Sequence, residues 1–178
     1  YYLQAARQLG NDRDLQFSVP TGNFGDIFAG SLAVSSFQEG QALLCATNAN
    51  DVLRRTLEEG VYDRRRTLKK TLSPSMDIVV SSNFERALYL ALKRNPERLR
   101  GVMEALERDG VTRIPPDALE ALRAQFRADS CDDRQALAVI GQVYRKHGYL
   151  MDPHTAAAWH ALEGTGVPGI ALSTASPY

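Results

Sequence analysis

The stretch that most constrains the fold is LQFSVPTGNFGDIFAGSLAV, which occupies residues 15–34. It opens with the apolar run from Leu15 to Val19, which is too short for a helix and suits a buried strand. Glycines at positions 22 and 25 follow the run, and from Asp26 onward apolar residues recur at helical spacing. This stretch therefore predicts a strand, a glycine turn and a helix.

A second unit repeats this order further along the chain. Residues 42–46 form an apolar run, residues 47–50 offer polar side chains that could cap a helix, and residues 52–57 carry an apolar stripe that stops at Gly60. Successive strand–helix units are typical of a parallel sheet with crossover helices. We expect an α/β fold with an open, mostly parallel sheet and flanking helices.

The middle of the chain has a different pattern. Residues 62–76 show no periodicity and predict a loop, which carries the basic cluster Arg64 to Lys70. From Asn95 to Gly148, three amphipathic helical stripes follow one another, the second running through Phe126. This segment is interpreted as a helical insertion in the α/β frame.

Three parts are therefore expected along the chain. Residues 1–94 form an α/β part, residues 95–148 the helical insertion, and residues 149–178 a return helix and strand of the α/β part, truncated at its C-terminal end. The first residues resemble the middle of a helix and lack an initiating Met, so the sequence is interpreted as a fragment.

Composition excludes several classes of protein. Lys plus Arg and Asp plus Glu both number 21, so the strong basic field of a nucleic-acid-binding protein is missing. Two cysteines are too few for a disulfide framework and are expected to be reduced thiols. No signal peptide and no apolar run near 18 residues is present, which predicts a cytoplasmic protein without a membrane span.

The glycine turn after the first strand is the strongest candidate for a binding site. Backbone N–H groups that converge at the start of a helix favour an anion, and a phosphate is the common case. The alternative is a tight turn that needs glycine only for its backbone angles. The turn has neither a Walker lysine nor the third glycine of a dinucleotide fingerprint, so ATP and NAD fit poorly.

Residues 20–30, PTGNFGDIFAG, resemble the loop with which threonine synthases bind the phosphate of pyridoxal phosphate (PLP). Four further blocks resemble segments of the same family in the same order: ATNAND (residues 46–51), TLSPSMDI (71–78), SSNFER (81–86) and GYLMDPHTA (148–156). The match covers nearly the whole chain. It implies part of the large domain of a fold type II PLP enzyme.

The resemblance also assigns cofactor contacts. The amides of Gly22, Asn23, Phe24 and Gly25 would hold the PLP phosphate, and Thr174 would place its hydroxyl against the pyridine nitrogen. A neutral hydroxyl leaves that nitrogen less protonated than a carboxylate would, which moderates the electron sink. Ser176 stands where the family usually has His.

The activity implied is the conversion of O-phospho-L-homoserine and water into L-threonine and phosphate. The Schiff-base lysine of the family belongs to an earlier segment, so no catalytic residue is expected in this chain and the fragment alone is expected to be inactive. Two alternatives are kept: a non-catalytic α/β phosphate-binding module, and another fold type II PLP lyase.

Other candidate residues carry weaker signals. Ser81 and Asn83 could contact substrate or cap a helix, and the basic cluster could attract a phosphorylated substrate or be a solvated surface. No metal site is expected, because His154 and His160 are too few and poorly spaced. Asp152, His154 and Thr155 are expected to cap and orient a helix.

Overall fold

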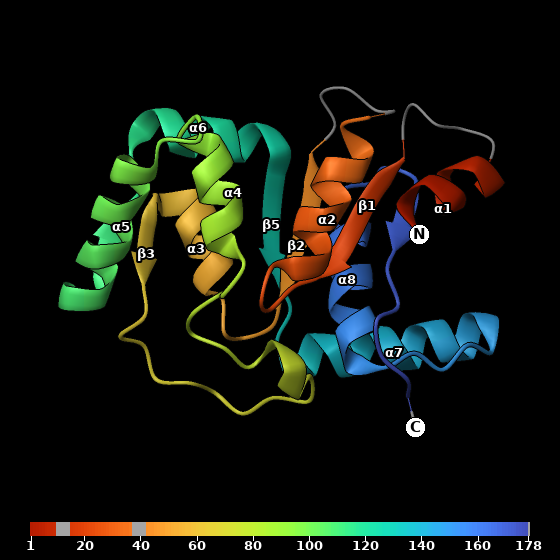
Figure 1. Ribbon diagram of the computed structural model, residues 1–178. Coiled ribbons are helices and arrows are strands. Elements are labelled where there is room, and N and C mark those ends of the chain that lie inside the picture. Colours follow the sequence, from red (N-terminus) through yellow and green to blue (C-terminus); the bar gives the residue numbers. More distant parts are fainter. Residues whose placement is uncertain (10–14, 37–41, 178) are drawn as a thin grey trace.

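The computed structural model describes residues 1–9, 15–36 and 42–177, with a four-stranded parallel sheet in the order β5-β2-β1-β6 at its centre (Figure 1). The strands of this sheet are β1 (Gln16–Pro20), β2 (Leu43–Thr47), β5 (Phe126–Ser130) and β6 (Gly169–Ala171). The helices are α1 (Tyr2–Leu9), α2 (Gly25–Val34), α3 (Val52–Glu59), α4 (Phe84–Ala91), α5 (Pro96–Asp109), α6 (Pro116–Gln125), α7 (Asp133–His147), α8 (Pro153–Glu163) and the 3₁₀ turn η1 (Pro74–Met76). The predicted α/β fold with a mostly parallel sheet and flanking helices is confirmed.

Helices cover both faces of the sheet, as a parallel sheet requires. Phe17 and Val19 of β1 join the large core with residues of α2 and α3, whereas Leu44 and Ala46 of β2 pack against α8. Alternate residues of a strand point to opposite faces, so each strand serves both layers. The alanine-rich face of α8 lies close to β1, where the Ser18 hydroxyl donates to the Ala158 carbonyl at 2.7 Å.

A smaller layer lies beside β5, on the side away from β1 (Figure 1). It holds the antiparallel pair β3 (Val61–Asp63) and β4 (Val111–Arg113) together with α4, α5 and α6. The sequence pattern did not predict either strand, because three residues are too few to show alternation. β3 includes residues 62 and 63, so the first two residues of the segment predicted as a loop are part of a strand.

The segment 95–148, predicted as helical, also contains two strands, β4 and β5. Helices α5, α6 and α7 are present, but the helix expected to run through Phe126 ends at Gln125. Phe126 begins β5, which pairs in parallel with β2 and forms an edge of the main sheet. Phe126 continues the apolar spacing of α6, and only pairing with β2, distant in sequence, makes it a strand. The three-part division itself stays a prediction.

Both cysteines are buried and free, as expected. Burial raises the pKa of the Cys45 and Cys131 thiols to about 12, so both remain protonated and unreactive at neutral pH. Among the described helices, none combines the length and the apolar character that a membrane crossing would need.

Candidate functional site

The candidate site lies at the edge where the strands of the parallel sheet end. Residues 21–24 follow β1, residues 48–51 follow β2, and Thr174 comes shortly after β6. β6 is paired beside β1, and the Leu172 amide extends this contact by donating to the Ser18 carbonyl at 2.9 Å. The fold therefore brings the glycine turn and the segment around Thr174 to neighbouring strand ends, the usual ligand position in open α/β sheets.

Two carbonyl groups of the glycine turn accept hydrogen bonds from Ser81 and Asn83. The Gly22 carbonyl accepts from the Ser81 hydroxyl at 2.8 Å, and the Asn23 carbonyl accepts from the backbone N–H and the side-chain amide of Asn83 at 3.0 and 2.9 Å. The peptide bonds here are trans, so each N–H points opposite to the preceding carbonyl. The N–H groups of Asn23 and Phe24 therefore point away from Ser81 and Asn83.

The N–H groups of the turn are available for a ligand. No described residue accepts a hydrogen bond from the backbone N–H of residues 22–25. The Phe24 carbonyl accepts from the Phe28 N–H at 3.1 Å, which leaves the Gly25 N–H directed out of the helix end. Free amides and the positive end of the α2 dipole together suit an anion.

The two glycines serve close approach rather than unusual backbone angles. A Cβ on Gly22 would lie 2.9 Å from the Ser75 carbonyl oxygen, and one on Gly25 would lie 3.3 Å from the Asn83 side-chain amide. The residue with a left-handed backbone is Phe24, with φ of 66°. The interpretation that glycine supplies the turn's dihedral angles is therefore not what the structure shows.

The side chain of Phe24 fixes the turn in this conformation. It is 1% exposed and makes edge-on contacts with Phe84 at 5.3 Å and Phe126 at 4.9 Å between ring centroids. Burial of a phenylalanine contributes about 1.5–3 kcal/mol, which offsets the strain of one left-handed residue. The aromatic cluster thus links the turn to α4 and to β5.

Ser81 and Asn83 support the turn from behind. The Ser81 hydroxyl donates to the Gly22 carbonyl, and the Ser81 N–H donates to the buried Tyr62 hydroxyl at 2.8 Å. Asn83 is the N-terminal residue before α4, but its side chain bonds to the turn instead of capping that helix. Contact of these two residues with a substrate stays a prediction.

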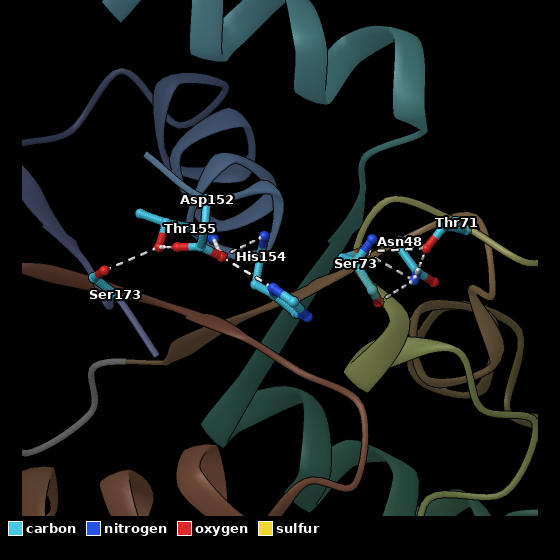
Figure 2. A network of polar contacts seen from close by, with 7 residues as sticks. All are labelled: Asn48, Thr71, Ser73, Asp152, His154, Thr155 and Ser173. Carbon is cyan, nitrogen blue, oxygen red and sulfur yellow. Dashed lines mark hydrogen bonds and ion pairs between the residues drawn. The ribbon is translucent and has the colours of Figure 1, made fainter. Parts of the chain in front are cut away.

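Thr174 is exposed, and no described residue forms a hydrogen bond with its hydroxyl. Just before it, the Ser173 hydroxyl is hydrogen-bonded to Thr155 at 3.1 Å, which ties this segment to the start of α8 (Figure 2). Thr174 is therefore anchored by its neighbour while its own hydroxyl stays available.

The start of α8 is organised by Asp152, as predicted (Figure 2). Its carboxylate accepts from the N–H groups of His154 and Thr155, from the Thr155 hydroxyl, and from Nδ1 of His154 at 2.9 Å. Burial opposes its ionisation, but hydrogen bonds from Thr155 and His154 outweigh this and lower the pKa of Asp152 below its ordinary value. The carboxylate is therefore charged at neutral pH.

A second polar network, which the sequence analysis did not find, fills the turn after β2. The Asn48 side-chain amide donates to Thr71 Oγ1 and Asp77 Oδ1, both at 2.8 Å, and Asn50 donates to Asp77 at 3.0 Å. Thr71 also donates to Asp77 through its hydroxyl at 2.6 Å and its N–H at 2.9 Å. Residues 47–50 were predicted to cap α3, yet these asparagines hold the following loop instead. Figure 2 shows Asn48, Thr71 and Ser73 in this network.

The basic cluster divides into paired and unpaired cations. Arg64 donates to the Glu107 carbonyl at 2.8 Å, and Arg65 forms an ion pair with Asp63 at 2.8 Å. Arg66, Lys69 and Lys70 have no ion-pair partner among the described residues.

The chain is similar to threonine synthases over nearly its whole length. It is 43% identical to the threonine synthase of Pseudomonas aeruginosa, an alignment that covers 99% of this chain and 39% of the relative. A crystal structure of PLP-bound threonine synthase from Brucella melitensis superposes with a TM-score of 0.92 at 43% identity, covering 99% of this chain and 39% of that one. The yeast threonine synthase structure gives a TM-score of 0.89 at 31% identity, with 99% and 38% covered.

No protein-family model matches the chain. The chain spans about two fifths of the length of the bacterial and yeast threonine synthases that it matches. Over that part, both the order of the sequence blocks and the backbone agree with threonine synthases. The chain therefore belongs to the threonine synthase family.

Proposed function

We propose that the full-length gene product is a PLP-dependent threonine synthase that converts O-phospho-L-homoserine and water into L-threonine and phosphate. The observation that carries this proposal is the turn at residues 22–25, where four amides without a described partner lie in a segment that matches a PLP-bound relative. PLP supplies an electron sink for chemistry at the carbons of a bound amino acid. The residues of this chain fit the phosphate end of that group.

In this proposal the turn binds the phosphate of PLP. Each amide that donates to the dianion contributes about 1.5–3 kcal/mol, because hydrogen bonds to charged acceptors are the strong ones. The carbonyls of Gly22 and Asn23 are already bound by Ser81 and Asn83, so the amides need no rearrangement when the anion arrives. A preformed site of this kind reduces the entropy lost on binding.

At the other end of the cofactor, Thr174 would bond to the pyridine nitrogen. Its exposed hydroxyl and its position three residues after β6, the strand paired with β1, support this role. A hydroxyl holds the ring in orientation without forcing full protonation of the nitrogen, unlike a carboxylate. Asn83 and Ser81 are also proposed to contact the substrate, in addition to the hydrogen bonds by which they hold the turn.

This chain by itself is proposed to be inactive. Covalent capture of PLP needs an amine that burial keeps partly neutral, and all the lysines of the chain are exposed: Lys69, Lys70, Lys93 and Lys146. The protein that carries this chain is proposed to supply the lysine from another segment.

The test compares the full-length gene product with the chain of 178 residues. With PLP and O-phospho-L-homoserine, the full-length product should release threonine and phosphate in equal amounts, and the chain alone should release neither. Borohydride treatment with PLP, followed by peptide mass spectrometry, should label one lysine outside this chain. Threonine formation by the chain alone, or a stoichiometric label on one of its four lysines, would refute the assignment of the lysine. Failure of the full-length product to form threonine would refute the function.

A further inference from the structure

His154 has a buried ring nitrogen that forms no hydrogen bond within the described part of the chain. Nδ1 of the ring lies 2.9 Å from Oδ1 of Asp152, whereas Nε2 is buried and has no partner among the described residues. The residue as a whole is 9% exposed. A buried polar atom without a partner costs about 1–3 kcal/mol, and nearly all such atoms in folded proteins have one. The partner of Nε2 is therefore expected among bound molecules or groups outside this chain.

The Asp152 carboxylate determines which ring nitrogen stays open. Burial opposes its ionisation, but hydrogen bonds from Thr155 and His154 keep the pKa of Asp152 below its ordinary value, so the carboxylate is charged at neutral pH. A charged carboxylate only accepts hydrogen bonds, and the proton of the neutral imidazole therefore lies on Nδ1. Nε2 keeps its lone pair and can accept a hydrogen bond from a ligand.

His154 lies at the edge of the sheet where the strands end. Its neighbour Thr155 is hydrogen-bonded to Ser173, which comes two residues after the end of β6. In Figure 2 the His154 ring extends from α8 toward the side on which Asn48 lies, and Asn48 directly follows β2. The strand between β2 and β6 is β1. His154 therefore lies on the same edge as the glycine turn that follows β1.

Within the pair, the imidazole is the outer member and the carboxylate the inner one. The His154 side chain is 11% exposed, whereas the Asp152 side chain is 2% exposed. Asp152 is held in place by the N–H groups of His154 and Thr155 and by the Thr155 hydroxyl. A histidine that a buried carboxylate orients through one nitrogen, with the other nitrogen free, is the arrangement that enzymes use to hold or deprotonate a ligand O–H group.

We propose that Nε2 of His154 binds and orients the water molecule that is added to the substrate. The inference rests on the proposed function, in which water is a reactant. Nε2 accepts one O–H of this water, and the water oxygen keeps its lone pairs for the substrate carbon. Water added to the carbon skeleton that remains after phosphate leaves gives threonine. If that water is not delivered, hydrolysis of the same skeleton gives 2-oxobutyrate and ammonia, which together contain the same atoms as threonine.

The test uses the full-length gene product with PLP and two variants that separate the ring nitrogens. In His154→Asn, the side-chain amide keeps a donor to Asp152 in the place of Nδ1 and has no atom at Nε2. In His154→Gln, the longer amide reaches the position of Nε2. With O-phospho-L-homoserine, His154→Asn should still release phosphate, but the ratio of threonine to 2-oxobutyrate should fall about tenfold or more. His154→Gln should recover part of that ratio.

His160→Asn is the matched control, because His160 lies on the same helix and its Nε2 is already hydrogen-bonded to Gln135 at 3.2 Å. It should leave the product ratio unchanged within about twofold. Circular dichroism confirms that each variant is folded.

Crystal structures of the full-length product give a readout that does not depend on turnover. The wild-type protein with PLP should show an ordered water within hydrogen-bonding distance of His154 Nε2, and His154→Asn should lack it. A protein group bonded to Nε2, an unchanged product ratio in His154→Asn, or an equal loss in the Asn and Gln variants would overturn the inference. A wild-type product that releases no phosphate from the substrate would instead refute the proposed function, so the two failures are distinguishable.

Discussion

The turns after β1 and β2 begin alike, at the ends of neighbouring parallel strands, but they use their polar groups in opposite ways. After β1, carbonyls of the turn are bonded to Ser81 and Asn83, while the amides of residues 22–25 have no described partner. After β2, the side-chain amides of Asn48 and Asn50 donate hydrogen bonds to Asp77 in the loop that follows β3. The first turn therefore leaves backbone amides free for a ligand, whereas the polar side chains of the second turn are bonded to another segment of the chain.

This difference shows how the same strand-end position can serve binding or support. A turn built from glycines exposes its backbone, whereas a turn rich in asparagine can bind another segment of its own chain. The second turn holds the basic loop in place, because the Asn50 side chain bonds to the N–H and the carbonyl of Lys69. Four substitutions test this comparison through the free energy of unfolding, from the largest expected change to the smallest.

Asp77→Ala should disrupt the hydrogen bonds of the turn after β2 and lower the free energy of unfolding by about 3 kcal/mol. The half-buried carboxylate accepts from Asn48, Asn50 and Thr71, so its removal takes one acceptor from each side-chain amide and leaves the Thr71 N–H without its acceptor. Urea denaturation of the full-length product measures the loss, and trypsin should cleave the basic loop sooner. Asp109→Ala, which removes a carboxylate whose one ion-pair partner among the described residues is its exposed neighbour Arg108, should remain near wild type. Equal losses in the two variants would contradict the role of the network.

Gly22→Ala should distort the turn after β1 and lower the free energy of unfolding by about 2 kcal/mol. The added Cβ would meet the backbone of Ser75 at 2.9 Å and of Met76 at 3.1 Å, and backbone cannot move aside as a side chain can. PLP affinity, measured by absorbance titration, should fall more than tenfold because the amides shift.

Gly101→Ala is the matched control for that substitution. Gly101 lies within α5, and a Cβ there would meet no atom within 4 Å. Alanine at this position should raise the free energy of unfolding by about 0.5–1 kcal/mol and leave PLP affinity unchanged. Similar PLP affinities in the two variants would show that the turn does not hold the cofactor.

Asn83→Ala should remove one hydrogen bond to the turn after β1 and lower the free energy of unfolding by about 1 kcal/mol, the usual contribution of one hydrogen bond. The backbone N–H of Asn83 still donates to the Asn23 carbonyl, so the turn keeps one of its two bonds there. PLP affinity should fall a few-fold. Ser82→Ala serves as the control, because its hydroxyl reaches the Asn23 side chain rather than the backbone of the turn. If the control weakens PLP binding as much, Asn83 has no special role.

Thr174→Val should change stability by no more than about 0.5 kcal/mol, because the exposed hydroxyl has no described partner and the volume is nearly constant. Threonine formation by the full-length product should nevertheless fall about tenfold or more, since the hydroxyl is proposed to hold the pyridine nitrogen. Thr174→Ser keeps the hydroxyl and should retain most of the activity. A wild-type rate in the valine variant would place the pyridine nitrogen elsewhere.

The sequence by itself determined the strand–turn–helix units, the cap at Asp152 and the position of the glycine turn. These depend on residues near one another in the chain, where periodicity and capping act directly. Asp152 caps α8, as the local pattern predicts.

Only the tertiary structure decided which polar groups remain free for a ligand. Phe126 ends a helical stripe in sequence but becomes a strand because it pairs with Leu43, and Asn48 could cap a helix but bonds instead to Asp77. The Asn23 and Phe24 amides are open because Ser81 and Asn83, about sixty residues away, bind the carbonyls behind them. Such contacts join segments far apart in the chain, so no local sequence pattern encodes them, and they form only when the whole sheet assembles.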